Sequence, residues 1–137
     1  MSKTPRTRDV TPAQARVRLR SAQAYLEVAD LVLSDLDRVE MPGVAAGLAV
    51  LAGIAGSDVI CACRLGHIHR GDDHRAAANM LKDAIPDADR LASTFLRLID
   101  LKDEAHYGLL NVAPQRAHNA VRWAGQLVDR ARIELER

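Results

Sequence analysis

Residues 41–57 read MPGVAAGLAVLAGIAGS and form the longest stretch of the chain without a charged side chain. The apolar character continues to about residue 66, and apolar side chains would lie on all sides of a helix formed by this segment. A helix without a polar face must be surrounded by other helices, because its apolar surface has to be removed from water. The stretch is too short and too weakly hydrophobic for a membrane span. It therefore predicts a buried central helix over residues 43–66.

The segment before this helix predicts a long amphipathic helix. Thr11, Pro12 and Gln14 form a start signal, with a threonine cap, a proline at the first helical position and a glutamine three residues after the cap. The apolar residues that follow recur at alternating gaps of four and three, a helical rather than a strand spacing. They are Ala15, Leu19, Ala22, Leu26, Ala29, Leu33 and Leu36. Pro42 and Gly43 are expected to end this helix.

Three more helices are predicted after the central one. Asp72 or Asp73 can cap a third helix. A fourth, capped by Asp87, is expected to continue to about Gly108, and Pro114 suits the first turn of a fifth. No strand signal and no internal repeat competes with these helices. The sequence thus predicts an all-α fold, an antiparallel four- to five-helix bundle with short connections.

The size and composition favour one globular domain over residues 11–137. The 137-residue chain is 48% apolar and 27% charged, which excludes a disordered protein, and it is long enough to close a single core. A net charge of +1 excludes a globally basic nucleic-acid binder. Residues 1–20 nevertheless hold six basic side chains against one acidic one. Residues 1–10 are therefore expected to be a flexible basic tail, either solvated or in contact with phosphate.

The two cysteines, Cys61 and Cys63, indicate a reducing compartment, because a disulfide scaffold uses more cysteines at wider spacing. They are two residues apart and would point in nearly opposite directions on a helix, which favours inert thiols over a zinc site. No metal and no cofactor is expected. The polar start of the chain does not resemble a secretory signal, so a cytoplasmic location without membrane contact is expected.

Residues 58–74 concentrate the chemically versatile side chains. Arg64 and His69 are five residues apart. Arginine can hold a phosphate with two hydrogen bonds, and histidine can transfer protons near neutral pH. Such a pair can cleave RNA without a metal at the mouth of a helical cleft, or it can simply solvate a tight loop. Asp58 is the charged exception on the apolar helix and needs a partner, either as a structural anchor or as part of a site.

Four further residues are candidates for contact with nucleic acid: Arg70, His74, His106 and Tyr107. Arg70 and His74 form a second Arg/His pair in the same segment. His106 is equally explained as a residue at a helix C-terminus, where a protonated imidazole interacts favourably with the helix dipole. Tyr107 is equally explained as a half-buried core residue.

With these elements in order, the chain resembles a HEPN domain, the small helical nucleotide-binding domain of prokaryotic toxin–antitoxin and defence systems. The resemblance covers about residues 12–135. It is carried by the long amphipathic first helix, the Ala-rich segment GLAVLAGIAGSD at residues 47–58, the Gly71-x-x-His74 entry to a short helix and the Ala-His-Tyr sequence at residues 105–107. It implies an antiparallel bundle that often dimerises. Active members cut RNA without metal, using an Arg followed four to six residues later by a His.

Two functions from different classes are therefore expected. The first is a homodimeric HEPN-like component of a toxin–antitoxin or defence locus that binds or acts on RNA or nucleotide. If it is an enzyme, the resemblance implies a metal-independent endoribonuclease in which Arg64 holds the scissile phosphate and His69 acts as general acid or base. The alternative is a non-catalytic helical interaction module that binds or neutralises a partner protein such as a nucleotidyltransferase.

Overall fold

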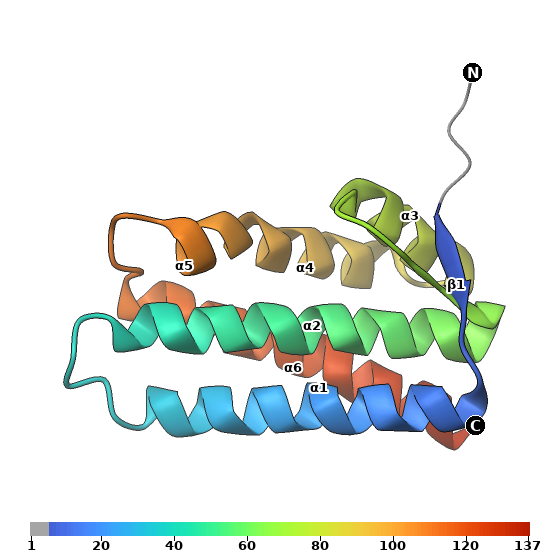
Figure 1. Ribbon diagram of the computed structural model, residues 1–137, viewed down its shortest axis with the longest axis horizontal. Helices are drawn as coiled ribbons and strands as arrows, with labels where there is room; N and C mark the ends of the chain where they lie inside the picture. Colours follow the sequence, from blue (N-terminus) through green and yellow to red (C-terminus); the bar gives the residue numbers. More distant parts are fainter. Residues whose placement is uncertain (1–5) are drawn as a thin grey trace.

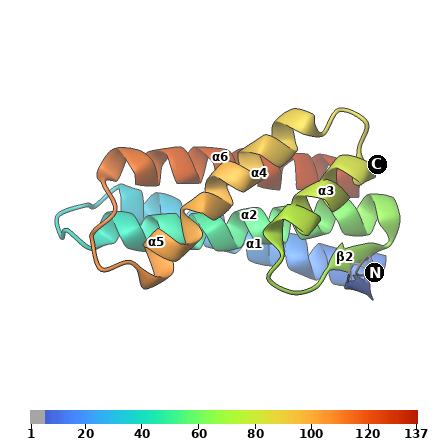
Figure 2. The same ribbon diagram turned by 90° about the horizontal axis from the view of Figure 1, so that it is seen from above.

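A computed structural model describes residues 6–137. The elements run in the order β1 (Thr7–Asp9), α1 (Pro12–Leu33), α2 (Met41–Leu65), β2 (His67–His69), α3 (His74–Ala84), α4 (Asp89–Asp100), α5 (Lys102–Tyr107) and α6 (Pro114–Glu136). α1 and α2 lie antiparallel, α6 runs along both of them, and α3, α4 and α5 form a layer over α2 (Figures 1 and 2). The predicted all-α helical bundle is confirmed.

α2 is the central helix of the bundle. It packs most extensively against α1 and α6 and is covered on its remaining side by α3, α4 and α5. Ala46, Val50 and Ile60 are completely buried, and one contiguous core joins α2 to α1, α3, α4 and α6. By length and composition α2 could also cross a membrane, but 72% of its most apolar window is buried inside the fold. The predicted burial of this helix is confirmed.

The start of α1 is formed as the sequence predicts, but its end is not. The backbone N–H of Gln14 donates to the Thr11 side chain at 3.1 Å, and the Gln14 side chain accepts from the Thr11 N–H at 2.9 Å. The expectation that Pro42 ends this helix is wrong, because α1 ends at Leu33 and Pro42 lies in the first turn of α2. Proline is compatible with a first helical turn, where its missing N–H is not needed.

A two-stranded antiparallel ladder closes one end of the bundle, where neither strand was predicted. Gly66 ends α2 in the left-handed conformation at φ 78°, which turns the chain back along the N-terminal segment. Thr7 then pairs with His69, and Asp9 with His67. The expectation of a flexible tail over residues 1–10 is therefore wrong for β1, while residues 1–5 lie outside the described part. Three-residue strands are too short to produce a period-two pattern.

The later helices show one confirmed cap and two corrections. The Asp73 side chain accepts from the N–H of Ala76 at 3.0 Å and caps α3. Asp87 does not cap α4, whose N-cap is Ala88; its carboxylate is instead paired with Arg130 at 3.2 Å. The predicted fourth helix is also interrupted at Leu101, which separates α4 from α5.

Close packing of α2 on α6 depends on Gly56. A Cβ atom at this position would lie 3.1 Å from the carbonyl carbon of Leu127 and 3.2 Å from the amide nitrogen of Val128, both in the α6 backbone. We expect Gly56→Val to lower the free energy of unfolding by about 2–3 kcal/mol, because a helix backbone cannot move aside as a side chain can. Urea denaturation measures this.

Gly125, on α6, provides the matched control. No heavy atom outside its own helix lies within 4 Å of a Cβ at this position. Gly125→Ala should therefore raise stability by about 0.5–1 kcal/mol through helix propensity alone. Equal effects of the two substitutions would show that the α2–α6 approach is not tight.

Candidate functional site

Four ionisable side chains from four elements line one cavity of about 220 Å³, which we call the histidine cavity. Arg18 comes from α1, Asp58 from α2, His69 from β2 and His74 from the first turn of α3. These elements converge at the end of the bundle that carries the ladder (Figure 1). The remaining lining residues are Ile54, Ser57, Gly71, Ala77 and Phe95. Three of the predicted site residues, Asp58, His69 and His74, are thus brought together.

Asp58 has the charged partner that its place on an apolar helix requires. The Arg18 guanidinium donates to Asp58 Oδ2 from Nη2 at 2.8 Å and from Nε at 3.1 Å. Burial raises the pKa of the Asp58 carboxyl, and the charges of Arg18 and His69 oppose that rise. The ion pair joins α1 to α2 and leaves other Arg18 N–H groups free to bind a further anion.

Arg18 was not predicted as a site residue, although the sequence contains a signal for it. It lies three residues after Ala15 and four before Ala22, two fully or nearly buried positions on the apolar side of α1. Residues at these spacings share a helix face. An arginine on the face that packs against α2 therefore indicates a buried carboxylate partner, and Asp58 is the acidic residue of α2.

His74 is in contact with a lysine that sequence spacing did not connect to it. The Nζ atom of Lys102, the first residue of α5, lies 3.3 Å from His74 Nε2. Since an ammonium only donates, this contact is a hydrogen bond in the tautomer whose Nε2 accepts and whose ring proton is on Nδ1. Burial lowers the pKa of His74, the positive charge of Lys102 lowers it further, and Asp72 and Asp103 act in the opposite direction. His74 is consequently a neutral imidazole at neutral pH.

Arg64 lies elsewhere and is bound to a buried carboxylate. Its Nε atom is 3.0 Å from Glu134 Oε2, and the Glu134 side chain, on α6, is 0% exposed. Arg130 contacts the other oxygen of Glu134 at 3.1 Å. Arg64 does not line the histidine cavity. The structure therefore does not bring the predicted Arg64/His69 pair together in one cavity, and sequence reasoning missed Glu134 as the partner of Arg64.

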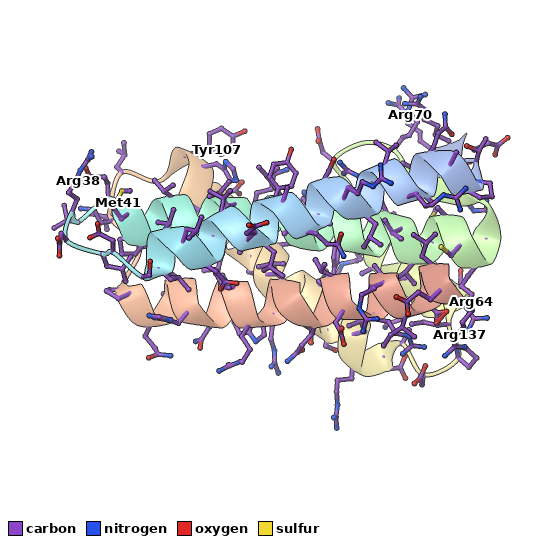
Figure 3. All side chains as sticks on the ribbon, turned by 90° about the horizontal axis from the view of Figure 1, so that it is seen from below. Arg38, Met41, Arg64, Arg70, Tyr107 and Arg137 are labelled. Carbon is purple, nitrogen blue, oxygen red and sulfur yellow. The ribbon has the colours of Figure 1, made fainter. Side chains whose placement is uncertain are left out.

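The other predicted contact residues divide between the two ends of the molecule. Arg70 follows β2, donates its backbone N–H to the Arg6 carbonyl at 2.8 Å, and lines a separate cavity of about 400 Å³ that shares Gly71 with the histidine cavity. His106 lies against α2 beside Gly47, where a Cβ would be 3.4 Å from the ring. Tyr107 is 75% exposed, so the half-buried alternative is wrong. Figure 3 shows Tyr107 in the half of the molecule that carries Arg38 and Met41, away from Arg64 and Arg70.

The two cysteines are free thiols. Cys61 is buried, and burial raises the pKa of its thiol to about 12, so it stays protonated and unreactive. Cys63 is half-buried, and burial raises its pKa as well. Within residues 6–137, no three His, Cys, Asp or Glu side chains are grouped closely enough to hold a metal ion.

The histidine cavity is lined by a neutral imidazole, a second imidazole and the Arg18–Asp58 ion pair, and the Lys102 ammonium lies beside it, in contact with His74. Such a set can bind a phosphate and transfer protons at its oxygens. Among known proteins, no family model matches the chain, and no curated protein matches it significantly. The functional assignment therefore depends on these side chains.

Proposed function

We propose that the chain is a HEPN-like component of a toxin–antitoxin or defence locus that binds RNA at the histidine cavity and cleaves it without a metal. The observation that carries the proposal is the 3.3 Å contact between His74 and Lys102 beside a cavity that also holds His69 and Arg18. RNA cleavage needs a proton acceptor, a proton donor and positive charge around one phosphate. These side chains supply all three.

In the proposed reaction the ribose supplies its own nucleophile. A bound phosphate attracts the Lys102 ammonium to its oxygen, which frees Nε2 of His74 to accept the 2′-hydroxyl proton. The 2′ oxygen then forms a bond to phosphorus, the bond from phosphorus to the 5′ oxygen breaks, and His69 donates a proton to that oxygen. Lys102 and Arg18 stabilise the extra negative charge in the transition state. The products are a 2′,3′-cyclic phosphate and a 5′-hydroxyl, so no water and no redox partner enters this step.

This proposal moves the phosphate-holding role from Arg64 to Lys102 and Arg18. The guanidinium of Arg64 is held by the fully buried Glu134, whereas Arg18 remains 40% exposed beside the cavity. The homodimer that the HEPN resemblance implies stays a prediction. The proposed reaction does not require it, because all the proposed reacting groups come from one chain.

The test is RNA cleavage in EDTA by the wild type, by Lys102→Ala and by Lys82→Ala. We expect the wild type to produce cyclic phosphate ends and Lys102→Ala to be slower by about 100-fold, because one charge-stabilising donor is lost. Lys82, exposed on α3, is the matched control and should retain the wild-type rate. Absence of cleavage by the wild type, or equal rates for all three proteins, would overturn the enzymatic proposal.

A different observation favours the non-catalytic alternative. Tyr107, the last residue of α5, and Leu109 and Leu110, in the α5–α6 connection, are 75%, 101% and 83% exposed. Clustered exposed apolar side chains mark protein contacts. A helical interaction module that binds a partner such as a nucleotidyltransferase would use this segment. This non-catalytic function is favoured if the wild type neither cleaves nor binds RNA.

A further inference from the structure

A second cavity shares the Arg18–Asp58 ion pair with the histidine cavity. It has a volume of about 180 Å³ and lies between the ladder and the bundle. We call it the ladder cavity. Both ion-pair residues line both cavities, so the two are separated by little more than this pair. A molecule that reaches from one cavity to the other would pass the Arg18 guanidinium.

The walls of the ladder cavity are mainly aliphatic. Val10 and Ile68 contribute from the ladder side, and Ala15, Val59 and Ala62 from α1 and α2. A cavity of about 150 Å³ with aliphatic walls is large enough to hold benzene. The ladder cavity therefore has room for one six-membered ring, and because it is open on one side, the second ring of a purine would project toward solvent.

Polar groups at the cavity allow recognition of a heterocycle rather than a hydrocarbon. Gln14 uses its side-chain oxygen to accept from the Thr11 N–H, so its amide N–H groups remain as donors. Arg8, on β1, adds a guanidinium. The carbonyl oxygens of a pyrimidine base are acceptors, and they match donors at the edge of an apolar slot.

We infer that the ladder cavity binds the pyrimidine base of the nucleotide whose phosphate enters the histidine cavity. The inference rests on the proposed function for the identity of the ligand and assigns its substrate class, RNA cleaved next to a pyrimidine. Arg18, which lines both cavities, would then contact the nucleotide between its base and its phosphate. The β1 segment acts as one wall of the base site.

Binding of four probes tests this inference: uridine 5′-monophosphate, guanosine 5′-monophosphate, uridine and inorganic phosphate, each titrated by calorimetry or protein NMR. The variant Ala62→Leu places a larger side chain in the ladder cavity, and Val10→Phe does so from the ladder in case the first variant is unfolded. Ala24→Leu, at an exposed position of α1, is the matched control.

We expect the wild type and Ala24→Leu to bind the uridine nucleotide at least about 10-fold more tightly than the guanosine nucleotide, and to bind uridine alone. Ala62→Leu and Val10→Phe, which fill the ladder cavity, should lose this preference and keep the wild-type affinity for inorganic phosphate. Equal affinity for both nucleotides in the wild type overturns the inference but leaves the proposed function intact. If neither inorganic phosphate nor the phosphate of either nucleotide is bound, the proposed function is contradicted. Binding of uridine in that case would still support the base site.

Discussion

His74→Ala is expected to reduce the rate of metal-free RNA cleavage by about 100-fold or more, the usual contribution of a general base. The reason is that His74 is held neutral by burial and by Lys102, so it can accept a proton at neutral pH. Single-turnover cleavage of a labelled RNA in EDTA measures the loss. His118→Ala, at an exposed position on α6, is the control and should cleave at the wild-type rate.

The pH dependence distinguishes a proton acceptor from a residue that only supports the fold. A lowered pKa means that His74 loses its proton at a lower pH than an ordinary histidine, whose pKa is about 6.5. The acidic limb of the wild-type rate profile should therefore have its midpoint below that value. In Lys102→Ala the nearby positive charge is gone, and the midpoint should move to higher pH. An unchanged acidic limb in Lys102→Ala would contradict the role of His74 as base.

Glu134→Ala is expected to lower the free energy of unfolding by about 3 kcal/mol, because it removes the buried carboxylate that holds α2 and α6 together. Glu134 is fully buried and contacts Arg64 from α2 and Arg130 from its own helix. The two arginine side chains are 35% and 23% exposed. After the substitution, the two guanidinium groups can be hydrated. The expected loss of stability is therefore at the lower end of the range for breaking a buried ion pair. Urea denaturation gives the value.

Glu136 supplies the control for this prediction. It lies two residues further along α6 and pairs with Arg132 at 3.1 Å, but its side chain is 65% exposed. Glu136→Ala should change stability by no more than about 0.5 kcal/mol, because exposed ion pairs are screened by water. If Glu134→Ala and Glu136→Ala lower the free energy of unfolding by the same small amount, Glu134 is not a structural anchor. RNA cleavage by folded Glu134→Ala should be retained, since neither Glu134 nor Arg64 lines the histidine cavity.

The helices were predictable because their signals are local. The apolar spacing of α1, the absence of a polar face in α2 and the caps at Thr11 and Asp73 are all contained within a few helical turns. The errors arose where a local signal had two meanings. Pro42 and Asp87 are compatible with a helix boundary, but the first opens a helix instead of ending one, and the second pairs with a distant arginine.

The candidate site was only partly predictable because its pairs are distant in sequence. Residue type alone identified His69, His74 and Asp58 as chemically versatile. Their cationic neighbours depend on tertiary packing: Arg18 is 40 residues from Asp58, and Lys102 is 28 residues from His74. No spacing rule links such residues. The same holds for Arg64, whose partner lies 70 residues further along the chain.

The short ladder at the end of the bundle has a consequence for how the molecule can vary. β1 contributes Arg8 to the ladder cavity but no buried side chain to the core. If the ladder cavity is the proposed base site, exchange of Arg8 would alter the ligands it accepts without removing a side chain from the hydrophobic core. Arg8 is thus a part of the proposed base site that lies outside the core, whereas Val59 belongs to both the core and the ladder cavity.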